Sequence, residues 1–289
     1  MSGAAANTAL PSGSNNVRIL FVGDIFGKPG REIARRAIPA LTEQRDIDFV
    51  IANVENSAAG FGVTGDIADA ILGYGVDVMT SGNHIWDKKE ILEYLPRQPK
   101  LLRPANFPAG APGRGSYLAR TRTGEPVGVV NLMGRIFMAP LDDPFAAAIR
   151  EIDALRAKTR VVIVDFHAEA TSEKIAMAWH LDGRATAVFG THTHVQTADE
   201  RILPKGTACL TDVGMTGPHE SIIGVTVEAA LSRFLNGMPA KFESATGPGR
   251  LNAVIVSADP ASGKATAIER INLSAREVEA LADVAAPSH

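Results

Sequence analysis

The sequence has little cysteine, since Cys209 is the single such residue among 289. One cysteine can form neither an intrachain disulfide nor a thiolate metal cluster, so we expect a reducing compartment and metal sites built from nitrogen and oxygen. No apolar run approaches the roughly 18 residues that a membrane span needs. Residues 1–16 lack the basic start and apolar stretch of a signal peptide. These absences favour a cytoplasmic protein that is neither secreted nor embedded in a membrane.

A strong excess of charge of either sign is also lacking. The 29 lysine and arginine residues against 32 aspartate and glutamate residues give a net charge of −3. Such a balance provides no general attraction for nucleic acid, so we expect no direct nucleic-acid binding. A substrate that carries phosphate would then need positive charge concentrated at one place, and this requirement points to bound metal ions.

No internal repeat and no long linker rich in proline, glycine and serine divides the chain. The apolar fraction of 45% is that of an ordinary globular protein and supplies enough residues for one continuous core. We therefore expect a flexible N-terminal tail over residues 1–16, a single domain over 17–280 and a flexible C-terminal tail over 281–289.

Short β-rich runs alternate with helical patterns, which is typical of a layered α/β protein. Several runs consist almost entirely of Val, Ile, Leu and Phe, as expected for strands buried on both faces. A closing hairpin is expected to pair residues 252–256 with 265–271. The strands expected in chain order are residues 17–22, 49–54, 76–80, 127–132, 161–166, 185–189, 207–211 and 251–256.

Helical patterns fit between these runs. One is expected over residues 66–72, where Thr64 can cap the start and Gly73 or Gly75 can end the helix. A second is expected over about residues 88–94. The loops over residues 104–115 and 138–144 are rich in glycine or proline, and we expect them at the surface near the functional site.

Polar side chains able to bind a metal ion follow the successive buried runs. In open α/β sheets the loops at the carboxyl ends of neighbouring strands converge, so five such loops can meet at one point. The side chains concerned are Asp24 after the first run, Glu55 and Asn56 after the second, Asn83 and His84 after the third, His167 after the fifth, and His192 and His194 after the sixth.

Most of these residues have an ordinary structural explanation when taken singly. Asp24 and Asn83 suit turns, and His167 suits a hydrogen-bonded core position. The pair His192-x-His194 directly after a strand and a glycine is a frequent metal-ligand arrangement and indicates metal binding more strongly. The coincidence of all of them at strand ends favours a metal site.

The motifs resemble those of the calcineurin-like metallophosphoesterases, and within them the small YmdB-like bacterial branch. The resemblance extends from residue 17 to about 220, and the order and spacing of its motifs make it specific. It implies a four-layer α-β-β-α sandwich with two stacked mixed sheets and the metals at one edge. The matching segments are Gly23-Asp24, Asn53-Val54-Glu55-Asn56, Ser81-Gly82-Asn83-His84-Ile85-Trp86-Asp87, Asp165-Phe166-His167-Ala168-Glu169 and Gly190-Thr191-His192-Thr193-His194.

Two departures from the broad superfamily match the YmdB-like branch. The usual Asp-x-His opening is Asp24-Ile25-Phe26 here, and Glu55 replaces the usual bridging aspartate. In that branch the residue after the glutamate is a ligand, which implies that Asn56 is one here. The resemblance thus implies one metal on Asp24, Glu55, Asn56 and His194 and a second on Glu55, Asn83, His167 and His192, with Glu55 bridging.

The activity that the resemblance implies is hydrolysis of a small phosphodiester, above all a 2′,3′- or 3′,5′-cyclic nucleotide. A hydroxide that bridges the two metals would attack phosphorus, and His84, oriented by Asp87, would protonate the leaving oxygen. Iron or manganese is the metal that the resemblance suggests, and the nitrogen and oxygen ligands also allow zinc. Two divalent ions carry four positive charges, and the implied ligands include only two acids. The centre therefore keeps a positive charge, which suits a phosphodiester monoanion.

Other functions stay open at this point. A phosphomonoesterase or nucleotidase would need extra positive side chains for its dianionic substrate, and Arg103 and Arg135 lie in candidate loops. A metal-dependent nucleotide sensor with little turnover, acting on RNA metabolism through a partner, is the alternative from another class. Exposed loops in such folds often mediate assembly, so a homo-oligomer also stays open.

Overall fold

The computed structural model describes residues 16–238 and 241–285, which form two β-sheets. The first sheet has seven strands of mixed direction. The strand order is β2-β11-β12-β1-β3-β4, with β13 pairing to β12. Strands β1, β3 and β4 run parallel, whereas β12 is antiparallel to β1 and forms the expected closing hairpin with β13. The strands are β1 Val17–Val22, β2 Asp24–Ile25, β3 Phe49–Asn53, β4 Val78–Thr80, β11 Met215–Pro218, β12 Gly249–Ala258 and β13 Ala265–Ser274.

The second sheet has six strands in the order β5-β6-β7-β8-β10-β9. Its central strands β6, β7, β8 and β10 are parallel, while β5 and β9 pair antiparallel at the two edges. The strands are β5 Ser116–Arg120, β6 Pro126–Met133, β7 Val161–His167, β8 Ala187–Thr191, β9 Arg201–Ile202 and β10 Ala208–Leu210.

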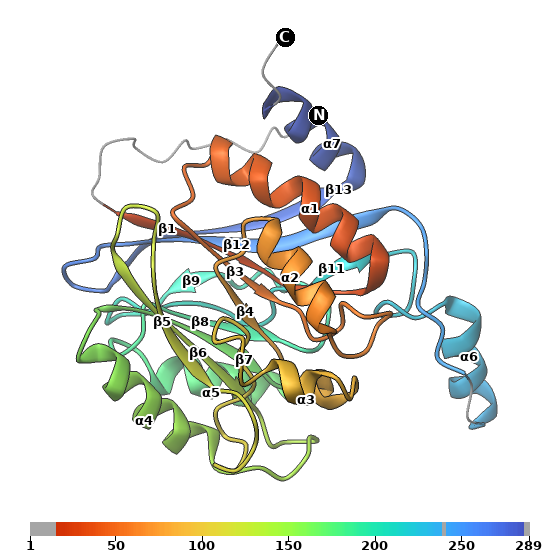
Figure 1. Cartoon of the computed structure of the whole chain (residues 1–289), viewed down its shortest axis with the longest axis horizontal. Helices are drawn as coiled ribbons and strands as arrows, with labels where there is room; N and C mark the ends of the chain where they lie inside the picture. Colours follow the sequence, from red (N-terminus) through yellow and green to blue (C-terminus); the bar gives the residue numbers. More distant parts are fainter. Residues whose placement is uncertain (1–15, 239–240, 286–289) are drawn as a thin grey trace.

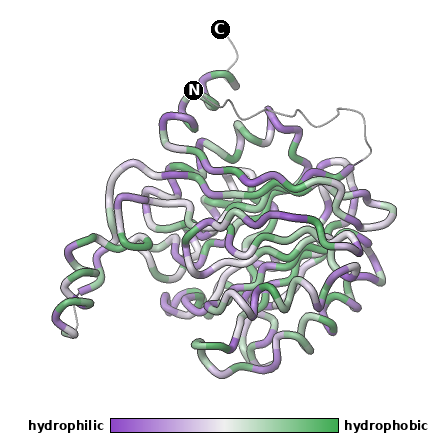
Figure 2. The backbone as a smooth tube through the Cα atoms, turned by 180° about the vertical axis from the view of Figure 1, so that it is seen from behind, coloured by the Kyte–Doolittle hydropathy of each residue, from purple (hydrophilic) through white to green (hydrophobic). Residues whose placement is uncertain are grey.

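Alternation of side chains along the strands builds three apolar layers. Ile19 and Phe21 of β1 face the second sheet, where they meet side chains such as Phe189. Leu20 and Val22 of the same strand point the other way, onto helices. Because successive side chains of a strand leave opposite faces, a run that is apolar throughout must be covered on both sides. Figure 2 shows hydrophobic residues concentrated along the strands inside the molecule.

Helices cover the outer face of each sheet, so the expected four-layer sandwich is confirmed (Figure 1). Helices α1, α2 and α7 contribute to the core on the first sheet, and α4 and α5 to the core on the second. The helices are α1 Gly27–Gln44, α2 Gly65–Gly73, the 3-10 turn η1 Asn83–Trp86, α3 Ile91–Tyr94, α4 Pro144–Arg156, α5 Thr171–His180, α6 Val227–Asn236 and α7 Ala275–Ala285. Helix α6 stands apart from the sandwich, and none of its residues is buried.

The predicted cap of helix α2 was confirmed, whereas the helix predicted over residues 88–94 was wrong in part. The Thr64 hydroxyl accepts a hydrogen bond from the Ile67 backbone N–H at 3.3 Å and caps α2 as predicted. The helix predicted over residues 88–94 is regular only from Ile91. The carbonyls of Lys88 and Lys89 accept from N–H groups three residues ahead, which closes tight turns in place of α-helical ones.

The predicted end of the domain at residue 280 falls inside α7, which continues to Ala285. Val278 is buried against the first sheet and Leu281 packs against the same core, so the helix is anchored across that boundary. The predicted N-terminal tail lies outside the described residues except for Asn16, whose side-chain amide donates to the Thr266 hydroxyl at 2.9 Å. No helix in the described ranges is long and apolar enough to cross a membrane.

Candidate metal centre

Five strand ends from both sheets meet at one edge of the sandwich. Asp24 begins the short strand β2 directly after β1, and Glu55 and Asn56 follow β3. Asn83 opens the 3-10 turn after β4. In the second sheet His167 is the last residue of β7, and the His192–His194 loop follows β8. Since all five strands run parallel within their sheets, their carboxyl ends point to the same edge, as the sequence predicted.

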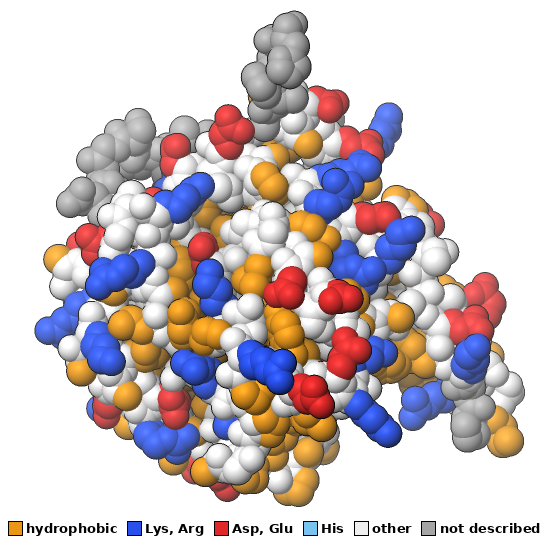
Figure 3. Space-filling view, viewed as in Figure 1, with side chains coloured by type: hydrophobic (Ala, Val, Ile, Leu, Met, Phe, Trp, Pro, Cys, Tyr) orange, Lys and Arg blue, Asp and Glu red, His pale blue; other side chains and the backbone are white. Residues whose placement is uncertain are grey.

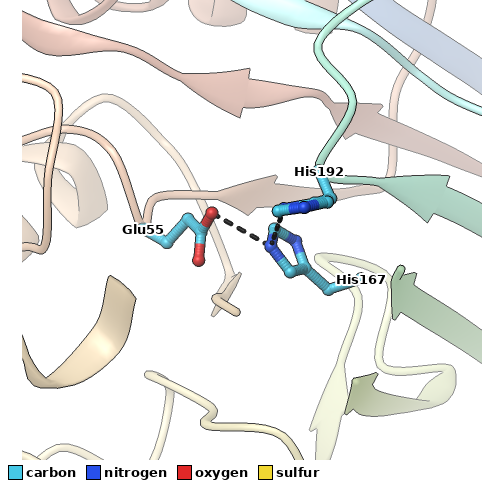
Figure 4. Close-up of side chains that lie close together, drawn as sticks. All are labelled: Glu55, His167 and His192. Atoms are coloured by element: carbon cyan, nitrogen blue, oxygen red, sulfur yellow. Dashed lines mark hydrogen bonds and ion pairs between the residues drawn. The ribbon is translucent and has the colours of Figure 1, made fainter. Parts of the chain in front are cut away.

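Glu55, His167 and His192 form the centre of the cluster. Figure 4 shows these side chains converging from three separate segments. The Glu55 Oε1 atom lies 3.0 Å from His167 Nε2, and His192 Nδ1 lies 3.1 Å from the same nitrogen. One potential ligand atom from each residue lies within 4.8 Å of the others. Glu55 and His167 are fully buried, and His192 is 22% exposed. This spacing is that of a candidate metal site.

Three further predicted ligands adjoin this centre. The Asn83 side-chain oxygen lies 3.1 Å from His167 Nε2. The Asn56 amide nitrogen donates to Glu55 Oε1 at 3.2 Å and lies 3.1 Å from His194 Nε2. His194 Nδ1 donates to a backbone carbonyl at 2.9 Å, which leaves Nε2 as the nitrogen that faces the cluster. Asn56 therefore presents its amide nitrogen, and holding a cation through oxygen requires the amide to turn over.

Asp24 completes the set from the side of β1. Its Oδ2 accepts a hydrogen bond from the His192 backbone N–H at 3.3 Å. Its Oδ1 is buried and has no hydrogen-bond partner among the residues that the structure describes. A fully buried carboxylate oxygen without a partner is costly unless a cation or donor satisfies it.

The pKa values of the cluster follow from burial and mutual charge. Burial works to raise the pKa of Glu55, yet the adjacent His167 lowers it to about 2. Burial works to lower the pKa of His167, and the Glu55 carboxylate raises it to about 9. Burial, together with the charge of His167, lowers the pKa of His192 to about 3. Burial raises the pKa of Asp24 well above its usual value. Without a cation, a proton on His167 therefore compensates the buried Glu55 carboxylate.

The residues fit a metal ion on two independent observations. Asp24 Oδ1 is buried without a partner in the described part of the chain, and the neutral His192 ring offers a lone pair to the centre. In addition, Gly82 keeps the space beside the cluster open. A methyl group added there would overlap the His167 ring and lie 2.5 Å from Glu55 Oε2. Carboxylate, amide and imidazole donors together suit iron, manganese or zinc.

The loop that carries the two histidines has an unusual backbone. His192 and His194 have φ angles of 98° and 65°, in the left-handed region that residues other than glycine seldom adopt. Between them, the Thr193 backbone N–H and hydroxyl donate to Asp212 Oδ2 at 3.2 and 2.6 Å. Lys174 Nζ of α5 lies 2.6 Å from the same oxygen, and both charged side chains are buried. This buried pair holds the loop in its strained conformation.

Sequence reasoning missed this support. Asp212 directly follows the predicted strand 207–211, so an acid at a strand end was available as a signal. Lys174 carries no comparable signal, because helix periodicity does not distinguish a lysine that reaches a buried partner from one in solvent.

His84 lies beside the cluster without belonging to its centre. Its backbone N–H donates to Glu55 Oε2 at 3.2 Å, and its ring Nδ1 lies 2.8 Å from Asp87 Oδ2. The ring is 28% exposed and packs against Phe61, with ring centroids 4.7 Å apart. Asp87 thus stands where an orienting acid was expected, and Nε2 is the ring nitrogen that Asp87 leaves free.

Two arginines that a dianionic substrate would need are engaged elsewhere. Arg103 donates to the backbone carbonyls of Pro104 and Ala111 at 2.8 and 3.4 Å. Arg135 pairs with Asp143 at 3.6 Å on the surface. In the space-filling view, acidic and basic side chains are interspersed over the visible face (Figure 3). Both arginines are thus paired with groups outside the cluster.

The fold and the cluster together place the protein in the class of metallophosphoesterase-type α-β-β-α sandwiches. Within it, the chain belongs to the family of YmdB-like proteins, whose model matches residues 20–271. This confirms the membership that the motifs predicted.

Relatives cover most of the chain. The 2′,3′-cyclic-nucleotide 2′-phosphodiesterase of Bacillus subtilis (strain 168) is 49% identical over 255 residues, which are 88% of this chain and 96% of the relative. The crystal structure of a hypothetical protein from Thermus thermophilus is 44% identical with a TM-score of 0.83, covering 89% of this chain and 99% of that one. The crystal structure of a phosphatase from Mycoplasma pneumoniae is 35% identical with a TM-score of 0.84, covering 90% and 94%.

Proposed function

We propose that this chain is a dinuclear-metal phosphodiesterase that hydrolyses a small cyclic nucleotide, with a 2′,3′-cyclic monophosphate as the first candidate. The observation that carries the proposal is the convergence of two carboxylates, two amides and three imidazoles from five strand ends into one largely buried cluster. The name of the Bacillus subtilis relative supports the choice of a cyclic nucleotide.

Within this proposal the ligands divide into two sets that share Glu55. Asp24, Asn56 and His194 would hold one cation together with Glu55. Asn83, His167 and His192 would hold the second cation, again together with Glu55. When bound, two such cations activate water and polarise the phosphoryl group. Iron or manganese is the proposed metal, with zinc as a third candidate.

The chain's own charges favour a diester over a monoester. Asp24 and Glu55 are the two acids among the seven donors, so a pair of divalent cations leaves the centre positive. A phosphodiester monoanion matches this modest charge. A monoester dianion would require additional cationic side chains, and Arg103 and Arg135 are engaged with other partners.

His84 acts as the proton donor in this proposal. Asp87 accepts from Nδ1, which orients the ring and leaves Nε2 to carry a proton toward the leaving oxygen. The ring is partly exposed, so it can regain a proton from solvent after each turnover. Its position next to Asn83 keeps it within the site without using it as a ligand.

Substrate comparison tests the proposed activity. Protein purified without chelator is expected to hold two metal ions per chain by elemental analysis. It should turn over bis-p-nitrophenyl phosphate faster than p-nitrophenyl phosphate, and 2′,3′-cyclic nucleotides faster than their 3′,5′ isomers. Preference for the monoester would favour a phosphomonoesterase. Tight nucleotide binding without product would favour the sensor.

Replacement of His84 tests the proton donor separately. The variant His84→Ala should retain its metal content and lose about 10²- to 10⁴-fold in kcat, because the leaving oxygen then departs without a general acid. His180→Ala, at an exposed position at the end of α5, is the matched control and should keep wild-type turnover. Unchanged kcat in His84→Ala would remove this residue from the mechanism.

A further inference from the structure

A buried hydroxyl links a ligand histidine to a carboxylate beneath the cluster. His167 Nδ1, on the side of the ring away from Glu55, lies 2.9 Å from Thr191 Oγ1. Thr191 Oγ1 in turn lies 2.7 Å from Asp165 Oδ1. All three side chains are fully buried. Neither Thr191 nor Asp165 is among the seven proposed ligands.

The direction of these hydrogen bonds is determined by the chemistry of the ring. If Nε2 presents a lone pair to a metal, the proton of the neutral ring must be on Nδ1. In the metal-free, doubly protonated ring, Nδ1 carries a proton as well. In both states the Thr191 hydroxyl accepts from Nδ1 and must send its own proton elsewhere. Asp165 Oδ1 is the acceptor at hydrogen-bond distance.

The Asp165 carboxylate accepts hydrogen bonds from side chains of both sheets. Its Oδ2 accepts from the Thr80 hydroxyl and from the Asn53 side-chain amide, the latter at 3.0 Å. The orientation of Asn53 is defined because its Oδ1 accepts from the Glu55 backbone N–H at 3.2 Å. Thr80 and Asn53 belong to β4 and β3, and Thr191 belongs to β8, so the carboxylate joins the two sheets directly under the cluster.

We propose that Thr191 and Asp165 are positioning residues that keep the proton of His167 on Nδ1 and so present Nε2 to the metal. The inference rests on the proposed metal centre. Partners of this kind around ligand histidines orient the ring, and their loss commonly lowers metal affinity by about 10- to 100-fold. Here a threonine hydroxyl lies between the histidine and the carboxylate. The hydrogen-bonded chain from His167 to Asp165 therefore requires a hydroxyl at position 191.

Three variants of the full-length protein separate this role from simple packing. Thr191→Val removes the hydroxyl and keeps the branched shape, whereas Thr191→Ser keeps the hydroxyl. Thr186→Val is the matched control, because Thr186 is equally buried just before the other end of β8. Its hydroxyl accepts from the Val162 N–H at 3.0 Å and donates to the Gly263 carbonyl at 2.7 Å, away from the cluster.

Zinc affinity, measured by competition with a chelator, is the first measurement. Thr191→Val should bind zinc about 10- to 100-fold more weakly, while Thr191→Ser and Thr186→Val should stay within about threefold of wild type. Equal affinity of Thr191→Val and wild type would overturn the inference while leaving the metal centre in place. An equal loss in Thr186→Val would overturn it too, since the effect would then be one of packing.

The tautomer of His167 is the second measurement and does not depend on turnover. In the zinc-loaded wild type, long-range ¹H–¹⁵N correlation spectra should show the His167 proton on Nδ1. Asp165→Asn should disturb this tautomer, because an amide that donates to Thr191 would turn its hydroxyl toward His167 Nδ1. An unperturbed Nδ1–H signal in this variant would contradict the inference. Wild-type protein that binds neither zinc nor manganese nor iron at the cluster would instead reject the proposed metal centre itself.

Discussion

Gly82 illustrates how a single residue controls access to the centre. It precedes Asn83 at the end of β4, and any side chain there would point into the space between His167 and Glu55. Only a residue without a Cβ atom fits at this position. The neighbouring atoms belong to a buried ring and a buried carboxylate, which cannot move aside without breaking their contacts.

We therefore expect Gly82→Ala to abolish metal binding, with the fold retained. Gly73→Ala is the control, because open space surrounds an added methyl group there at the end of α2. It should keep full metal content and be stabilised by up to about 1 kcal/mol through helix propensity. Elemental analysis and circular dichroism are sufficient to compare the two, and a fully loaded Gly82→Ala variant would show that the cations sit elsewhere.

His167 sets the pH dependence of metal binding. Its pKa of about 9 in the metal-free protein means that a proton must leave Nε2 before a cation can bind. Metal affinity should thus fall by about tenfold per pH unit as the pH drops below about 9. His192, with a pKa of about 3, does not compete with a proton in this range. Chelator competition at several pH values measures the slope, and a flat profile would contradict it.

At the scale of elements, helix α5 and the segment after β10 cooperate through one buried ion pair. Lys174 projects from α5 to Asp212, and this pair supports the loop between β8 and the following residues. A buried ion pair adds little net stability compared with a well-packed apolar pair, but removal of one partner leaves an uncompensated charge.

Lys174→Met should accordingly destabilise the protein by about 3–5 kcal/mol, since Asp212 would stay buried without its cation. Lys205→Met, on an exposed turn, should change the stability by less than about 0.5 kcal/mol. Urea unfolding of metal-free protein measures both, so that loss of metal does not confuse the comparison. A Lys174→Met variant as stable as wild type would mean that Asp212 is satisfied by Thr193 and Gly214 alone.

For the whole molecule, the proposed metal centre would couple cation binding to folding. The cluster joins strand ends of two sheets, and Asp24 and Glu55 are both fully buried. Cations bound there would neutralise these acids in the folded chain only, so metal binding would add to the free energy of unfolding. The two sheets are also joined beneath the cluster through Asp165.

Removal of metal by a chelator should therefore lower the Tm. A cation at a hundred times its Kd contributes about 2.7 kcal/mol, which corresponds to about 5–10 °C for a chain of this size. Differential scanning calorimetry before and after chelation gives the shift, and re-addition of the metal should restore the original Tm. A Tm that is indifferent to chelation would place the cations outside the buried cluster.

Strand and helix predictions succeeded where local patterns carry the information. Continuous apolar runs predicted β1, β3, β6, β7 and β12, and the cap at Thr64 predicted the start of α2. Strands β2, β5, β9 and β11 were missed, and each has five residues or fewer. Strands β2, β5 and β9 are edge strands, and β11 lies next to β2. Such short segments have too few residues for a period to appear.

The sequence by itself determined the α/β class and the chain positions of the proposed metal ligands, because a run of apolar residues and the polar residue that ends it are neighbours along the chain. Only the tertiary structure decided which groups support them. Lys174 and Asp212 lie 38 residues apart, and the direction of the Asn56 amide depends on His194, which lies 138 residues away. Periodicity reports which face of an element is buried, whereas the partner on that face is chosen by packing between distant segments.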